Sequence, residues 1–121
     1  EVEAKIDTGA DSTSIDTELA KQLGFEETLT IFEERMAGKN ILTEYTEQER
    51  ERLFSHIPDL ADTSITKSSH GTSYRPMIRL ELTLDSVAIS AKVSIIDRSD
   101  LKYAVIIGRK SLTKFLIDVN K

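Results

Sequence analysis

The sequence predicts a mainly β domain, a closed β-barrel with two or three short helices. Apolar residues alternate with polar ones along residues 78–84 and again along residues 87–95. This period of two, on both sides of the break at Asp85-Ser86, predicts a β-hairpin with one buried face. Residues 104–107 are all apolar and suit a strand that is buried on both faces.

Three helices are predicted, over residues 17–23, 46–55 and 109–115. Asp16 is a suitable N-cap for the first helix, and Gly24 is a suitable stop. Thr46 and Glu49 have the spacing of a capping box at the start of the second helix. The third helix follows a glycine that ends the apolar strand.

Further strands are expected at residues 2–7, 12–15, 28–32 and 115–119. Residues 59–75 are rich in Ser, Thr and Asp, which predicts a loop and an extended arm. Residues 1–121 suit a single domain. Within it, we expect the polar stretch 36–72 to be an insertion or a flap-like cover.

Composition excludes several classes of function. The chain has 16 Lys and Arg against 21 Asp and Glu, a net charge of −5, which disfavours a nucleic-acid partner. Cysteine is absent, so no disulfide framework or thiolate zinc site is expected. No apolar run is long enough to span a membrane.

We expect a cytoplasmic protein, because no signal peptide is visible and cysteine is absent. The chain begins with Glu, inside the first expected strand. We therefore expect that preceding residues have been trimmed, which leaves a periplasmic or anchored location open.

Residues 4–15, AKIDTGADSTSI, place Asp7 at the end of an extended run. A plain turn is one interpretation, since Asp and Gly are common turn residues. A calcium loop is another, because Asp11 and Glu18 fall at EF-hand positions five and twelve. Gly9 and Ser12 do not fit that loop, however, and its flanks are extended. Half of an aspartic protease site is the third interpretation.

A second segment favours the protease. Val105-Ile106-Ile107-Gly108-Arg109 repeats the pattern of two apolar residues and a glycine, and leads into a helix. Together with Asp-Thr-Gly-Ala, it resembles the paired signature of retropepsins. The stretches AKIDTGA, RPMIRLELTL, DRSDLKYAVIIGRKSL and FLIDV resemble a bacterial and archaeal retropepsin-like family labelled ATP-dependent zinc protease. The resemblance, which leaves out about residues 33–65, implies a closed acid-protease barrel and an aspartic endopeptidase.

The resemblance implies a catalytic loop of Asp7, Thr8 and Gly9. In aspartic proteases two carboxylates share one proton and hold the attacking water. This chain has one Asp-Thr-Gly, so the resemblance implies a homodimer in which the two Asp7 side chains meet on a two-fold axis. Thr8 would link the two loops through its hydroxyl, and Gly9 would let backbone N–H groups approach the water.

Ala10, Gly108 and Arg109 are expected to support this loop. Ala10 would be small because the loop packs under Gly108. Arg109 would tie the helix to the sheet, with Asp11 or Asp16 as its partner. A solvated helix start is the alternative for Arg109, since surface ion pairs are weak.

Arg75 and Arg98 are candidate ligands of a peptide or protein substrate. A guanidinium pairs with carboxylates bidentately, so both residues suit an acidic substrate. The resembling family is associated with ATP-grasp ligases that add glutamate to ribosomal protein, which implies glutamate-rich substrates. A solvated polar turn is the simpler interpretation of Arg98.

No cofactor and no metal are expected. His56 and His70 are the only histidines, and His-Glu-x-x-His is absent, so the zinc of the family's label has no evident ligands. A phosphate-binding Gly-x-x-x-x-Gly-Lys-Ser is absent as well, which disfavours direct use of ATP. A carboxylate metal site at Asp7 and Asp11 is left open.

A catalytically inactive binding or regulatory module is the alternative function. Alternation puts Lys5 on the same side as Asp7, and an ammonium there favours ionised carboxylates over a shared proton. The expected cover holds only Gly38 and Gly71, whereas retropepsin flaps have glycine-rich tips. The intact Asp-Thr-Gly-Ala and Ile-Ile-Gly-Arg stretches favour the enzyme, which is the function we expect.

Overall fold

A six-stranded sheet forms the centre of the computed structural model, which describes residues 4–7, 9–10, 12–68, 71–84, 86–98 and 102–112. The strand order is β1-β6-β2-β5-β4-β3. In sequence order the strands are β1 (Ala4–Ile6), β2 (Thr13–Asp16), β3 (Leu60–Ser68), β4 (Gly71–Leu84), β5 (Val87–Ile96) and β6 (Val105–Ile107). The mainly β character that the sequence predicted is therefore confirmed.

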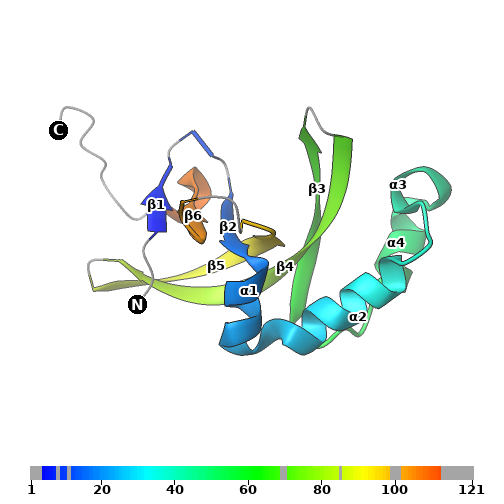
Figure 1. Cartoon of the computed structure of the whole chain (residues 1–121), viewed down its shortest axis with the longest axis horizontal. Coiled ribbons are helices and arrows are strands. Elements are labelled where there is room, and N and C mark those ends of the chain that lie inside the picture. Colours follow the sequence, from blue (N-terminus) through cyan, green and yellow to red (C-terminus); the bar gives the residue numbers. More distant parts are fainter. Residues whose placement is uncertain are drawn as a thin grey trace.

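The closed barrel is not observed, because the sheet is open in the described part of the chain. β1 and β3 are its two edges. β4 has 14 residues and β5 has 10, but β2 pairs only with the last four residues of β5, Val93–Ile96. The short strands therefore leave most of the long hairpin without partners that could close the sheet. In the view of Figure 1 the β4–β5 hairpin passes below β1, β2 and β6, and β3 stands at the other end of the sheet.

The predicted central hairpin is confirmed. β4 and β5 pair antiparallel from Met77 opposite Ser94 to Leu84 opposite Val87. Its apolar side chains lie on one face, and Ile78 and Val93 are completely buried there. The short strand β6 is buried at all three positions, as its all-apolar sequence predicted. The main core lies between this face, β2 and the first helix, and contains Ile15, Ala20, Leu29, Ile78, Ala91, Val93, Ile95, Val105 and Ile107.

The predicted first helix is confirmed. α1 (Thr17–Ala20) begins at the predicted cap Asp16 and continues into the helical turn Lys21–Phe25. Gly24, with a non-helical φ of 101°, ends this helix as predicted, and a second helix, α2 (Glu26–Met36), follows across the kink. The strand predicted at residues 28–32 is wrong, because Thr28, Leu29 and Phe32 are buried along one helical face.

Two further helices follow, α3 (Ile41–Glu44) and α4 (Glu47–Leu53). The predicted capping box is confirmed: Glu49 N–H donates to Thr46 Oγ1, and Thr46 N–H donates to Glu49 Oε1. α2 and α4 share a second core with β4. The rings of Phe32 and Phe54 stack at 4.7 Å between centroids, and Tyr74 stacks on Phe54 at 5.3 Å.

At residues 59–75 the predicted extended arm is confirmed but the predicted loop is wrong, since β3 and the start of β4 form a hairpin there. β3 is an edge strand of mostly polar residues, so no hydrophobic alternation marked it. At the predicted third helix the structure has a 3₁₀ turn, η2 (Arg109–Leu112). The strand expected at residues 115–119 lies outside the described residues. No described helix is both long and apolar enough to cross a membrane.

Candidate active site

Asp7 follows the edge strand β1 at the point where the chain leaves the sheet. β1 runs parallel to β6, with Lys5 beside Ile106 and Ile6 beside Ile107. The N–H of Asp7 donates to the carbonyl of Ile107 at 3.0 Å, which extends this pairing by one residue. The backbone of Asp7 is therefore fixed by the apolar strand that precedes Gly108.

A tight turn then orients the Asp7 carboxylate. Ala10 N–H donates to the Asp7 carbonyl at 3.1 Å, and Gly9 N–H donates to Asp7 Oδ1 at 3.0 Å. The side chain thus accepts a hydrogen bond from its own loop while it stays only half-buried. Thr8 lies outside the described residues, so its linking role remains a prediction.

Gly108 and Arg109 hold this loop from the other side. Arg109 N–H donates to the Ala10 carbonyl at 2.8 Å. A Cβ at Gly108 would lie 2.5 Å from the backbone carbon and oxygen of Ser12, so only glycine fits between these two chain segments. Ala10, Gly108 and Arg109 therefore lie together at this loop, where Gly108 packs on Ser12 and the contact from Arg109 is made by its backbone. An ion pair of the Arg109 side chain with Asp11 or Asp16 remains a prediction.

Thr13 and Ser111 complete this support, and the sequence reasoning missed both. Gly108 N–H donates to Thr13 Oγ1 at 3.1 Å, and Thr13 Oγ1 lies 2.6 Å from Ser111 Oγ. Both side chains are buried. The Thr13 hydroxyl, on the strand that follows Asp-Thr-Gly, could have indicated this contact. Its partners Gly108 and Ser111 are far away in the sequence, so no local pattern joined them.

Asp7 lines an open pocket of about 470 Å³. Lys5, Arg98 and Lys102 line the same pocket, so its lining holds three cationic residues and one carboxylate. Lys5 lies on the same side as Asp7, as the alternation of β1 predicted. The remaining lining comes from Ala10, Ser12, Ser14, Tyr103 and Ile106.

Asp16 holds the wall of this pocket that carries Arg98. Its Oδ1 accepts the N–H of Arg98 at 2.6 Å, and its Oδ2 accepts the N–H of Glu18 at 3.1 Å. Asp16 N–H also donates to the carbonyl of Ala104 at 2.8 Å, and Arg98 Nε donates to the carbonyl of Tyr103 at 2.9 Å. Asp16 therefore caps α1 and fixes the loop beside Asp7, a second role that the sequence reasoning missed.

Arg75 lies elsewhere. It lines a separate pocket against Phe32 and Glu33 of α2, and its Nε donates to Ser73 Oγ at 3.1 Å. The structure thus brings Arg98, but not Arg75, to the Asp7 pocket, and a substrate contact for Arg75 remains a prediction.

The described residues contain no group of three or more His, Asp or Glu side chains that could hold a metal ion. His56 is exposed in the turn after α4. His70 and Asp11 lie outside the described residues, so the carboxylate metal site at Asp7 and Asp11 is not tested.

The RimB-like family model, described as retropepsin-like aspartic endopeptidase RimB, matches residues 1–121. The chain belongs to this family. The match includes residues 33–65, which the resemblance from sequence stretches left out. A comparison with curated proteins found no match. The Asp7 loop and the contacts that Gly108 and Arg109 make with it are consistent with this family. The chain is therefore classed with the retropepsin-like aspartic peptidases.

Proposed function

We propose that this chain is an aspartic endopeptidase that hydrolyses peptide bonds with water held between two Asp7 carboxylates of a homodimer. The observation that supports this proposal most directly is the structure of the Asp7 loop. A half-buried carboxylate, held by Gly9 N–H, lines an open pocket in a chain of the RimB-like family. One carboxylate would take a proton from the water while the other donates one to the scissile carbonyl.

A second copy is required because one chain supplies one Asp-Thr-Gly. β1 is an edge of the sheet, and Ile6, the residue before Asp7, is 55% exposed. An exposed apolar residue beside the catalytic loop suits a contact with a partner copy. Like charges on two close carboxylates cannot both persist, so the pair would titrate as one unit.

An acidic, glutamate-rich substrate fits the charge of the pocket. Lys5, Arg98 and Lys102 line it beside a single carboxylate, although the chain as a whole carries a net charge of −5. Cations around a cleft attract and orient carboxylate side chains. Residues 36–72 are attached to β4 through the stack of Phe32, Phe54 and Tyr74. Their strand β3 is the sheet edge opposite β1, so we propose that they form an insertion and not a cover of the Asp7 pocket in the same chain.

The alternative is an inactive module that binds acidic peptides without cleaving them. The observation that favours it is Lys5, which lines the same pocket as Asp7. An ammonium there stabilises ionised carboxylates and so works against a shared proton. Binding without hydrolysis would separate this function from the peptidase.

The test compares peptide hydrolysis by the wild-type chain and by Asp7→Asn between pH 4 and 8. The substrate library includes glutamate-rich peptides. Asp59→Asn is the matched control, since Asp59 is an exposed carboxylate outside the pocket and asparagine tolerates its φ of 63°. We expect activity to disappear in Asp7→Asn and to persist in Asp59→Asn. Equal activity in all three proteins, or peptide binding with no hydrolysis in any, would contradict the proposal.

The dimer is tested separately by sedimentation of Ile6→Lys. A charge at this exposed position beside Asp7 should weaken dimerisation and activity together. Ile65→Lys is the control, because Ile65 is 47% exposed on β3, far along the sheet from β1. A fully active monomer would contradict the homodimer while leaving the role of Asp7 to the first test.

A further inference from the structure

A second recess, of about 600 Å³, lies between η2 and the β4–β5 hairpin, and its lining includes the apolar residues Met77, Ile89 and Ala91 as well as polar ones. Arg79 on β4, Lys92 on β5 and Lys110 on η2 all line it. Ser64, Ser90 and Ser111 add hydroxyl groups from β3, β5 and η2. The recess therefore gathers three cations and several hydrogen-bond donors from separate elements of a chain whose net charge is negative.

Two of these cations are held in an unfavourable arrangement. Arg79 and Lys92 are directly opposite each other in the antiparallel register of β4 and β5. Like charges at such a cross-strand pair are destabilising. The Lys92 ammonium contacts Asp62 Oδ2 at 3.1 Å. The Arg79 guanidinium donates to Ser90 Oγ at 3.5 Å, which is a long hydrogen bond. Glu81 follows on the same strand but does not line the recess.

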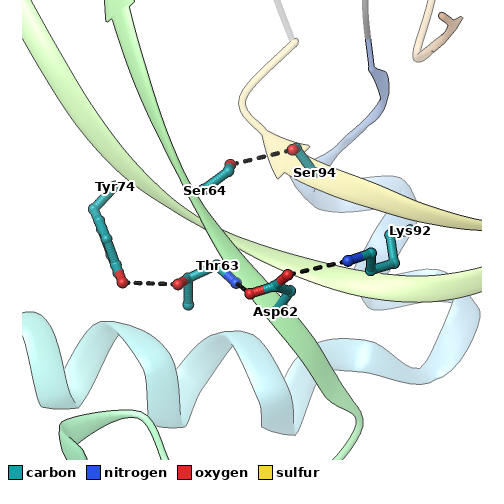
Figure 2. A network of polar contacts seen from close by, with 6 residues as sticks. All are labelled: Asp62, Thr63, Ser64, Tyr74, Lys92 and Ser94. Atoms are coloured by element: carbon teal, nitrogen blue, oxygen red, sulfur yellow. Dashed lines mark hydrogen bonds and ion pairs between the residues drawn. The ribbon is translucent and has the colours of Figure 1, made fainter. Parts of the chain in front are cut away.

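The wall formed by β3 and β5 is fixed by a polar network, which Figure 2 shows. Asp62 accepts the N–H of Thr63 at 2.8 Å as well as the ammonium of Lys92. These contacts hold the pKa of Asp62 below its usual range, first through the Thr63 N–H and then through Lys92. Ser64 Oγ lies 3.4 Å from Ser94 Oγ, so β3 is tied directly to β5.

The opposite wall is fixed by buried hydroxyls. Thr13 Oγ1 accepts the Gly108 N–H and lies 2.6 Å from Ser111 Oγ. When Thr13 donates its proton to Ser111, the Ser111 O–H can be directed into the recess. Lys110, which precedes Ser111 on η2, is exposed and lines the recess on the same wall.

We propose that this recess binds the phosphate group of a small phosphorylated molecule. Three cations and hydroxyl donors on three sides suit a tetrahedral group with three acceptor oxygens better than a planar carboxylate. A phosphate monoester carries about −1.5 to −2 charges at neutral pH, which offsets the repulsion between Arg79 and Lys92. The recess is larger than one phosphate, so the remainder of the molecule has room beside it.

The site is distinct from the proposed catalytic pocket and does not depend on peptidase activity. The two hollows meet at Ser12, which lines both, but none of the cations of one lines the other. A phosphate that bound beside Asp7 would instead contact Lys5, Arg98 or Lys102. Substitutions in each set therefore distinguish the two locations.

The test titrates the full chain with inorganic phosphate and with pyrophosphate at pH 7.5 and low salt, by calorimetry. Arg79→Gln and Lys110→Gln should each weaken binding by about tenfold or more, since each removes a charge-assisted contact. Asp62→Asn should tighten binding, because it releases Lys92 from its carboxylate. Arg52→Gln, an exposed cation on α4, and Lys102→Gln, in the Asp7 pocket, should leave the affinity within about twofold.

Amide chemical shifts of the wild-type chain locate the site without any substitution. Titration with pyrophosphate should move the signals of Ser90 and Lys110 and leave those of Ser14 and Lys102 in place. The proposal is overturned if neither phosphate nor pyrophosphate shows saturable binding. It is also overturned if wild type, Arg79→Gln and Lys110→Gln bind with equal affinity, or if Lys102→Gln loses as much affinity as Arg79→Gln and Lys110→Gln do.

Discussion

Replacing Gly108 by alanine tests the support of the Asp7 loop directly. The added Cβ would lie 2.5 Å from the backbone carbon and oxygen of Ser12, about 0.9 Å short of the 3.4 Å at which ordinary contact begins. Neither neighbour is a flexible side chain, so one of the two segments must move. That movement strains the hydrogen bond from Gly108 N–H to Thr13 Oγ1 and the one from Arg109 N–H to the Ala10 carbonyl.

The expected cost follows from these contacts. Overpacking typically costs about 1–3 kcal/mol, and an unsatisfied buried polar group costs about 1–3 kcal/mol more. We therefore expect Gly108→Ala to lower the free energy of unfolding by about 3 kcal/mol and the melting temperature by roughly 10 °C. Urea and thermal unfolding followed by circular dichroism measure both quantities.

Gly38→Ala is the matched control. Its Cβ would meet nothing within 4 Å, but its φ is +70°, so only backbone strain of about 1 kcal/mol is expected. Peptidase activity of Gly108→Ala should fall more than its folded fraction does, because the Ala10 contact orients the catalytic loop. A loss of stability no larger than that of Gly38→Ala would refute the close packing of Gly108 on Ser12.

Three further predictions follow from single contacts. Lys5→Met should weaken the binding of glutamate-rich peptides, because one of the three cations that line the Asp7 pocket is gone; unchanged affinity in a peptide titration would mean that Lys5 does not contact the substrate. Thr13→Val should lower the free energy of unfolding by about 1–3 kcal/mol, since it leaves the Gly108 N–H and the Ser111 hydroxyl without this partner; urea unfolding measures the loss, and Thr13→Ser should recover most of it. The pKa of Asp62 is lowered in the folded chain, so its contribution is present above the unfolded value of about 3.9 and is lost as the pH falls further. Asp62→Asn should therefore lower stability by no more than about 0.5 kcal/mol at pH 7, because the pair is half-exposed, and the difference should vanish in acid unfolding titrations.

The sequence was most informative where one local signal agreed with the tertiary packing. The alternation along residues 78–95 predicted the hairpin because one face of β4 and β5 is buried. Thr46 and Glu49 predicted a capping box because both hydrogen bonds lie within one turn. Asp7 and Gly108 were found because the stretches Asp-Thr-Gly-Ala and Ile-Ile-Gly-Arg resemble the paired signature of retropepsins.

The failures have three physical causes. Residues 28–32 have β-branched and aromatic side chains, but burial of Leu29 and Phe32 against the main and second cores outweighs that local preference. β3 is an edge strand with polar residues on both faces, so its sequence resembles a loop. The barrel was predicted from the number of short strands, whereas closure depends on strand lengths and register that no local pattern encodes.

The missed contacts of the site all involve β2, and they explain how a short edge strand can hold the Asp7 loop. Thr13, at the start of β2, accepts the Gly108 N–H, and Asp16, at its end, accepts the Arg98 N–H. β2 also pairs with both β5 and β6, so it is anchored in the middle of the sheet. The segments around Gly108 and Arg98, which lie beside the Asp7 loop, are therefore both fixed by β2. For this reason β1 itself needs only three residues. Substitutions on β2 should then affect the Asp7 pocket more than substitutions on the solvent-facing edge of β1.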